Sequence, residues 1–564
     1  MAVDVKSILC IVFIVSSCLF SLKVADGHPR IESVDFEAGG FVSSMKENWK
    51  LEKEIGSLER NSTEETQFPG ATGRLYCQKC GRSFNNTGRG FFFTDVVESM
   101  FSVVLSGINS MVTNIMGTGN DSKSGSIKVS YRNYQLIRVF PNTQDQVADL
   151  RGLRDSETED IKFWTEPINN KTTDVVVAPD IVSDLKMYLR EKGINFKVLI
   201  SDLQKAIAYQ NPRMTKEQRD DLVFTQGHSM TWKRYHRYGD IMKYLEYLSL
   251  RYPKLVELIT IGQSYEGQPI KMIKVSTGPN KEGDTKPAIW IDAGMHAREW
   301  IGTAVATYIL SQLVERNVTY AKLLDNADWM ILPVANPDGY EFSHTGDRLW
   351  RKTRSNHDIK FNRGYELGLL QYVSHYASWL WGNCDGVDPN RNFGYHWGED
   401  KNGGASLDPC HETYAGPHAF SEPETKAMAD YILSNRYNIR MYLTLHSYSQ
   451  MWLVPWGYTR SKPSDYSELI NVARKGINAI TKVHGTQYQL GLSADLMYPT
   501  SGASDDWAKG VAGIKYAYTI ELRDRGTYGF LLPASQIVPT AREIWAGIRT
   551  IARLINNSAI SKLH

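Results

Sequence analysis

Residues 291–300 contain a histidine and a glutamate, His296 and Glu299, three positions apart. An imidazole nitrogen and a carboxylate oxygen at this spacing can bind one metal ion together, and the two ligand types suit zinc. A catalytic zinc site needs a third protein ligand and leaves its fourth position to water. His-x-x-Glu alone is weak evidence, because the same spacing occurs in solvated pairs and in pairs at the edge of a core.

The sequence around this pair indicates a strand that runs into a helix. Residues 287–291 are a short apolar run suited to a buried strand, and residues 301–310 have the length and composition of a buried helix. Open α/β sheets bind ligands at such turns, so the third ligand should end a neighbouring strand. Of the thirteen histidines, His446 follows the apolar run 441–445 in that way. A strand-end histidine can also be structural, but beside the first pair we favour a metal ligand.

The composition indicates a protein of the secretory route. The 564 residues suffice for two or three domains. The net charge is +2, and the sequence contains no glycine-rich phosphate loop. Neither feature indicates nucleic-acid binding. Residues 1–27 combine Lys6, a short apolar run and small residues near the end, which predicts a signal peptide rather than an uncleaved anchor. We therefore expect a secreted, extracellular glycoprotein without a transmembrane span, whose sequons lie at Asn61, Asn85, Asn120, Asn170, Asn317 and Asn556.

Removal of the signal leaves four cysteines: Cys77, Cys80, Cys384 and Cys410. An even number in an oxidising compartment predicts one or two disulfides. Cys77 and Cys80 form a single Cys-x-x-Cys without nearby histidines, which favours a local disulfide or loop staple over a metal or redox site. Residues 28–126 are expected to be a poorly structured extension, to which we assign no activity.

Residues 127–219 are predicted to form a small domain and a linker. Strand-like and helix-like runs from Tyr134 to Ile200 follow one another in the order βαββαβ, which describes a ferredoxin-like α+β domain. A short helix is expected at residues 202–209. Residues 211–221 are polar, charged and interrupted by proline, so we expect an exposed linker, left uncut or cleaved by a trypsin-like protease at Arg213, Lys216 or Arg219.

Residues 220–564 alternate strands and helices, as a large α/β domain with a mixed sheet does. Within this part, seven blocks resemble, in order, the zinc metallocarboxypeptidases of the pancreatic A and B type. They are residues 294–301, 336–340, 348–355, 386–392, 446–450, 498 with 501–507, and 521–524 with 528–535. The resemblance covers about residues 235–557, and the βαββαβ unit is similar to the activation segment of that family. It implies a zymogen in which this unit covers the cleft until it is cleaved away.

The resemblance implies that one zinc ion is held by His296, Glu299 and His446. The ion would polarise the scissile carbonyl and acidify a bound water. Glu521, at a strand end, would accept the proton of that water and pass it to the leaving amine, and Arg351 would stabilise the oxyanion.

The same resemblance implies a substrate-binding set. Arg298 would line the approach, and Arg391 would bind the terminal carboxylate with Asn390 and Tyr498 beside it. Alone, each of these would be interpreted as a surface arginine, a turn asparagine or a packed tyrosine, and it is their combination that favours binding.

Asp505 decides the expected specificity. B-type relatives have an aspartate at this position, just before the shared Asp506, where A-type relatives are apolar. A buried carboxylate here would pair with a C-terminal Lys or Arg and penalise apolar side chains; otherwise Asp505 caps a turn that faces solvent. Ser493, Gly457 and Ala503 would also line the pocket, and Ala503 replaces the usual glycine.

Two segments depart from the family. Residues 356–383 replace a short loop, and the alternatives of an exosite, a narrowed cleft and a splicing artefact stay open. The resemblance nevertheless implies a disulfide between Cys384 and Cys410, which would match the family's loop disulfide. The extension 28–126 has no recognised counterpart.

We therefore predict a secreted zinc carboxypeptidase zymogen that hydrolyses the C-terminal peptide bond of peptides and proteins, with a preference for C-terminal Lys or Arg. The alternatives are A-type specificity for apolar or aromatic C-terminal residues, and a non-catalytic zinc- or peptide-binding relative. The presence of both Glu521 and Arg351 favours an enzyme over the last.

Overall fold

A computed structural model of the chain describes residues 74–77, 82–85, 128–155, 160–280, 283–357, 384–399 and 404–560. The chain forms two compact units, Met1–Ser122 and Lys123–His564. In the first, β1 (Arg74–Cys77) and β2 (Arg82–Asn85) pair antiparallel, with Cys77 opposite Arg82. The predictions for the signal, for the rest of the extension with Cys80, and for residues 358–383 of the insertion lie outside the described residues.

The second unit begins with the predicted ferredoxin-like domain. Its antiparallel sheet has the order β4-β5-β3-β6. The strands are β3 (Gln135–Phe140), β4 (Ile161–Phe163), β5 (Thr173–Val177) and β6 (Asn195–Ile200), and the helices are α4 (Gln144–Asp155) and α5 (Val182–Glu191), which follows the 3-10 turn η1 (Pro179–Ile181). Alternate strand residues such as Ile137 and Val139 pack against Leu150, Leu185 and Leu189 of the helices, which makes one core.

The predicted linker is partly helical. After α6 (Leu203–Gln210), residues 211–215 are irregular, but α7 (Lys216–Gln226) follows. Thr215 and Gln218 form a capping box at its start, and Gly227, in a left-handed conformation, ends it. The expected linker is therefore exposed but helical from Lys216 onward, a helix that the sequence analysis did not predict. The helix has no buried residue, so it lacks the apolar periodicity by which a helix is found in a sequence.

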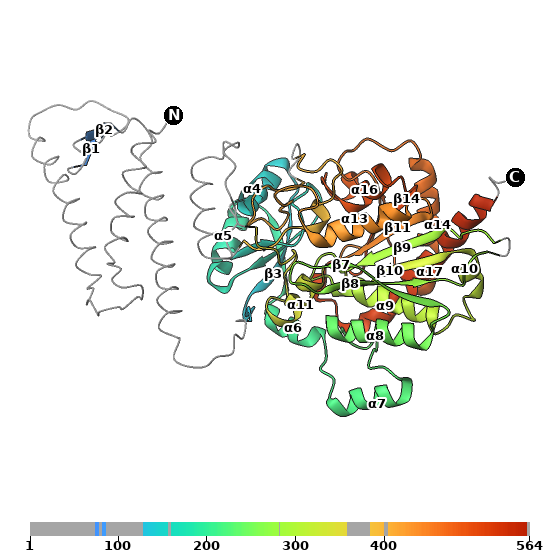
Figure 1. Ribbon diagram of the computed structural model, residues 1–564. Coiled ribbons are helices and arrows are strands. Elements are labelled where there is room, and N and C mark those ends of the chain that lie inside the picture. The colour runs from blue at the N-terminus through green and yellow to red at the C-terminus, as the bar shows by residue number, and fades with distance from the viewer. Residues whose placement is uncertain are drawn as a thin grey trace, which may run out of the picture. The chain divides into compact units, whose positions relative to one another are not determined.

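The large domain contains a mixed sheet of eight strands in the order β13-β12-β14-β11-β9-β10-β8-β7. Figure 1 labels β14, β11, β9, β10, β8 and β7 of this sheet. Its central strands β14, β11, β9 and β10 run parallel, and the hairpin β7–β8 joins β10 antiparallel. The strands are β7 (Val256–Gln263), β8 (Pro269–Val275), β9 (Ala288–Ala293), β10 (Asp328–Leu332), β11 (Ile439–His446), β12 (Met451–Val454), β13 (Gln489–Leu492) and β14 (Tyr516–Glu521).

Helices cover both faces of this sheet, so the central strands are buried on both sides. On β9, Ile289 and Ile291 pack into one core with α8 (Tyr238–Arg251), α9 (Trp300–Val314), α14 (Tyr466–His484) and α17 (Ile537–Ile560). Ala288 and Trp290 face a second core with α13 (Pro423–Asn435) and α16 (Ser504–Gly510). The remaining elements are α10 (Ala321–Asn326), α11 (Pro337–Thr345), α15 (Ser493–Leu496), η2 (Pro389–Arg391), η3 (Gly529–Leu531) and η4 (Ala534–Gln536). Within the described part of the chain, no helix has the length and apolar content to cross a membrane.

Candidate active site

The turn between β9 and α9 carries the first two candidate ligands. Gly294 has a φ of +67°, and a Cβ there would lie 2.7 Å from the Thr303 hydroxyl oxygen, so the turn requires glycine. The chain then folds back, and the Glu299 N–H donates to the His296 carbonyl at 3.2 Å. This local hydrogen bond places both side chains at the carboxyl edge of the sheet, as the spacing predicts.

His446, the last residue of β11, completes a buried cluster with His296 and Glu299. The two Nδ1 atoms lie 3.1 Å apart, and the Glu299 carboxylate oxygens lie 2.8 Å from Nδ1 of His296 and 3.0 Å from Nδ1 of His446. Nitrogens bound to one tetrahedral zinc at ~2.0–2.1 Å are separated by about 3.3 Å. Since two imidazole nitrogens and the two oxygens of one carboxylate converge at nearly this separation, the three residues fit a zinc ion.

Asp388 connects the cluster to Arg351. Its Oδ1 lies 3.0 Å from Nε2 of His296, and its Oδ2 accepts from Nη2 of Arg351 at 2.7 Å and from Nε at 3.1 Å. Burial opposes the charge, but Arg351, His296 and Arg391 outweigh it and hold the pKa of Asp388 well below its usual range. A permanent carboxylate at Nε2 keeps a proton on that nitrogen and leaves the Nδ1 lone pair for a metal. Asp388 lies in residues 386–392, which resemble the family, but no local pattern indicates this role.

Glu521 ends β14 directly beside His446 in the parallel register. The side chain is buried, and burial together with the negative charge of Glu299 raises its pKa to about 8. The charges of His446, Arg351 and Arg391 act in the opposite direction and favour the carboxylate. The predicted proton acceptor therefore lies next to the candidate metal ligands.

The predicted carboxylate-binding residues also lie together. Arg391 donates from Nη2 to the Tyr498 hydroxyl at 3.0 Å and from Nε to the Gly404 carbonyl at 2.6 Å. The Asn390 side-chain oxygen accepts the Ser504 N–H at 2.9 Å, which joins this group to the start of α16.

The first turn of α16 buries two adjacent carboxylates, Asp505 and Asp506. Asp506 accepts the N–H groups of Gly457 and Tyr458 at 2.8–2.9 Å, whereas Oδ2 of Asp505 has no hydrogen-bond partner among the described residues. Burial raises the pKa of Asp505, and burial together with the charge of Asp505 raises that of Asp506. Because Asp505 is 3% exposed, it does not cap a solvent-facing turn.

The other predicted specificity residues surround these carboxylates. A Cβ at Gly457 would lie 2.7 Å from the Thr500 hydroxyl, 3.4 Å from Oδ2 of Asp506 and 3.6 Å from the Ser493 hydroxyl. Ala503, immediately before α16, is buried as well. Glycine at position 457 therefore leaves open the space between these side chains.

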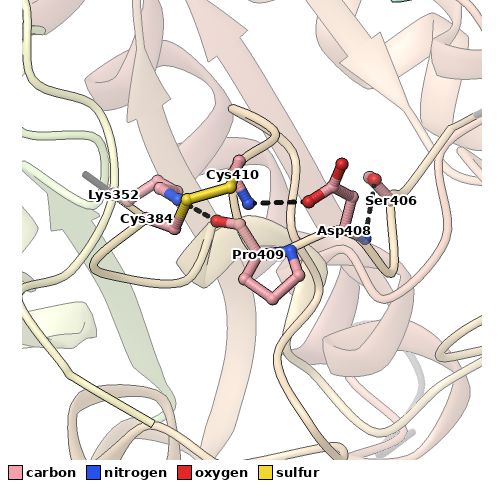
Figure 2. The surroundings of a disulfide bond; sticks show 6 residues. All are labelled: Lys352, Cys384, Ser406, Asp408, Pro409 and Cys410. Atoms are coloured by element: carbon pink, nitrogen blue, oxygen red, sulfur yellow. Dashed lines mark hydrogen bonds between the residues drawn. A yellow bond between two sulfur atoms is a disulfide. The ribbon is translucent and has the colours of Figure 1, made fainter. Parts of the chain in front are cut away.

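Arg298 contacts a carboxylate that no sequence pattern indicates. Its Nη1 donates to Oε2 of Glu412 at 2.8 Å and to the Leu349 carbonyl at 3.2 Å. Glu412 lies two residues after Cys410, which forms a disulfide with Cys384 as the resemblance implies (Figure 2). No local pattern marks Glu412, because its partner is more than a hundred positions away.

The small domain packs on residues next to the cluster. Trp164, just after β4, makes edge-on contacts with Phe530 and Tyr448, at ring-centroid distances of 5.0 and 6.3 Å. Asp174 of β5 accepts from the Tyr448 hydroxyl at 2.6 Å, and Lys171 donates to the carbonyls of residues 495 and 496. Tyr448 lies two residues after His446, so the small domain covers the surroundings of the candidate metal ligands.

The mixed sheet carries a His-Glu-His cluster at the ends of its parallel strands, and a small α+β domain packs beside that cluster. This combination is typical of zinc peptidases with an activation segment. Family comparison specifies the class: residues 241–547 match the zinc carboxypeptidases, and residues 137–210 match the carboxypeptidase activation peptide. The chain belongs to the zinc carboxypeptidase family. It is a metallocarboxypeptidase, a peptide hydrolase, with the activation peptide of a zymogen, and the predicted family and fold class are confirmed.

Relatives of both specificity types are similar to the chain. It is 45% identical to carboxypeptidase B of Astacus astacus over 58% of this chain and 99% of that protein, and 38% identical to carboxypeptidase A2 of Mus musculus over 74% and 92%. Among solved structures, thrombin activatable fibrinolysis inhibitor matches with 34% identity and a TM-score of 0.65 over 76% of this chain and 100% of that one. The carboxypeptidase A of Helicoverpa armigera matches with 28% identity and a TM-score of 0.63 over 76% and 99%. These relatives define the reaction but not the preferred C-terminal residue.

Proposed function

We propose that this zymogen, once cleaved, removes Lys or Arg from the C-termini of peptides with one zinc ion held by His296, Glu299 and His446. The bound ion would polarise the scissile carbonyl and acidify a water. Asp388 would fix the orientation of His296 and, through its other oxygen, the position of Arg351.

The side chains around the cluster would transfer the proton, stabilise the developing charge and bind the substrate. Glu521 accepts a proton from the attacking water and delivers it to the leaving amine nitrogen, so it must enter the reaction as a carboxylate. Arg351 donates hydrogen bonds to the oxygen on which negative charge develops. Arg391, with Asn390 and Tyr498, binds the free C-terminal carboxylate and so makes the enzyme an exopeptidase.

The observation that carries the Lys/Arg preference is the buried carboxylate of Asp505. Among the described residues, one of its oxygens has no hydrogen-bond partner, and the carboxylate of Asp506 follows directly in the chain. Burying such groups is costly unless a cation joins them. A lysine or arginine side chain of the substrate supplies that cation. An apolar side chain would leave the carboxylate unpaired, which disfavours A-type substrates.

The direct test uses matched peptides that differ only in their last residue, Arg, Lys, Phe or Leu. After cleavage of the purified protein with trypsin, kcat/KM should be highest for Arg and Lys. Release of Phe or Leu without release of Arg would refute the B-type preference and establish the A-type alternative.

We also propose that residues 1–27 direct secretion, that residues 28–126 are an extension and that the activation domain with its linker spans 127–219 before the catalytic domain, 220–564.

Among the candidate cleavage sites we favour Arg213. It is exposed and lies in the irregular stretch before α7, whereas Arg219 lies within α7 and its guanidinium is 3.6 Å from Asp240. Proteases cut exposed backbone that lacks regular hydrogen bonding.

Arg213→Gln should therefore suppress activation by limited trypsin treatment, and Arg219→Gln, the matched control, should not. Sequencing the N-terminus of the released catalytic fragment checks the site: it should begin at Met214 in the unsubstituted protein. A fragment that begins after Lys216 or Arg219, formed at the same rate in Arg213→Gln, would contradict this assignment.

A further inference from the structure

Glu412 is a carboxylate beside the candidate active site that has no role in the proposed hydrolysis. Its partner Arg298 lies between His296 and Glu299 in the sequence, and the Arg298 guanidinium lies 4.4 Å from the centre of the Phe530 ring. Through its ion pair with Arg298, Glu412 is connected to the turn that carries two candidate metal ligands. Arg298 was expected to line the approach of the peptide, so Glu412 adds a negative charge to that approach.

The loop before Glu412 is held by several contacts (Figure 2). The disulfide fixes Cys410, whose N–H donates to Oδ1 of Asp408 at 2.9 Å, and the Asp408 N–H donates to the Ser406 hydroxyl at 3.0 Å. Lys352, next to Arg351, donates to the Pro409 carbonyl at 2.6 Å. These contacts hold the loop up to Cys410, two residues before Glu412.

In the zymogen, a lysine of the activation domain contributes to the surroundings of Glu412. Burial raises the pKa of Glu412, but the charges of Arg298 and then of Lys162 outweigh it, so the pKa is lowered. Lys162 lies on β4, two residues before Trp164, which packs on Phe530. The Glu412 side chain is still 34% exposed with the activation domain in place. When that domain leaves, Lys162 leaves with it, and the exposed part of Glu412 is influenced by one positive charge fewer.

We propose that Glu412 is a specificity-determining residue for the part of the peptide that precedes its C-terminal residue. Its charge favours a basic side chain there and offsets the attraction of Arg298 for an acidic one. In the zymogen the positive charge of Lys162 acts on the same carboxylate. This inference rests on the proposed carboxypeptidase activity and extends its substrate class to peptides with basic residues near a basic C-terminus.

The test uses activated enzyme and peptides that all end in Arg, with Lys, Gln or Glu placed one or two positions before it. The unsubstituted enzyme should prefer Lys to Glu at one of these positions. Glu412→Gln retains an oxygen that accepts from Arg298 but loses the charge, so the Lys-to-Glu ratio of kcat/KM should fall by about fivefold. The change should arise mainly in KM, and the ratio of the unsubstituted enzyme should decrease as salt is added.

Asp430→Asn is the control, because Asp430 is an exposed carboxylate on α13 that pairs with Lys426, one helical turn before it. It should leave the ratio unchanged. An unchanged ratio in Glu412→Gln, or an equal loss on all three kinds of peptide, would overturn the inference, the latter by showing that Glu412 only positions Arg298. If the unsubstituted enzyme releases Arg from none of the peptides, the proposed function fails instead.

Discussion

Replacing Glu521 by glutamine is expected to leave zinc bound and to lower kcat by about 10²–10⁴-fold, the usual contribution of a general base or acid. Glu521 lies beside His446 in the sheet register but is not one of the three converging ligands. Glutamine has nearly the same shape and cannot accept a proton from water. The measurement is kcat on a peptide with C-terminal Arg, together with the zinc content of the same preparation.

An exposed carboxylate supplies the matched control for this substitution. Glu257→Gln, on β7, should retain full activity. Loss of zinc in Glu521→Gln would assign the residue to metal binding, and full activity with zinc retained would remove it from the mechanism.

The second large effect concerns the C-terminal side chain of the substrate. Asp505→Asn should lower kcat/KM for C-terminal Arg by about 10²–10³-fold, because one partner of a buried charge pair is removed. Activity on C-terminal Phe should be unchanged or higher, since the neutral amide no longer leaves a buried charge unpaired.

Opposite changes on the two substrates separate a role in specificity from a loss of folding, which would lower both. A variant that keeps the preference for Arg would contradict the assignment of Asp505. The cation-binding carboxylate would then have to be sought elsewhere in the domain.

The parts of this molecule that could be predicted from the sequence are those set by local patterns. The apolar strands that end at His446 and Glu521 were found because both faces of each strand are buried, which leaves continuous apolar runs. The candidate ligand pair His296 and Glu299 could be predicted because the two residues lie on one short turn. The ferredoxin-like domain could be predicted because its strands are short apolar runs and its helices α4 and α5 each bury a few spaced apolar residues.

The contacts that sequence patterns missed are those between distant positions. Nothing near Asp388 in the sequence indicates that one carboxylate serves both His296 and Arg351, and the same holds for the pairing of Glu412 with Arg298. Such pairs are chosen by the tertiary fold and leave no local periodicity. The helix α7 was missed for a different reason, since a helix without a buried face has no apolar period to detect.

The central claim is that two imidazoles and one carboxylate, contributed by distant parts of the chain, hold a single zinc ion that the reaction requires. Its most direct test is the zinc content and the activity of the full chain, His446→Ala and His418→Ala, each measured after the same activation. We expect one zinc per chain and full activity in the unsubstituted protein and in His418→Ala, which changes an exposed histidine, and loss of both in His446→Ala. One tightly bound zinc and undiminished hydrolysis in a folded His446→Ala variant would contradict the account.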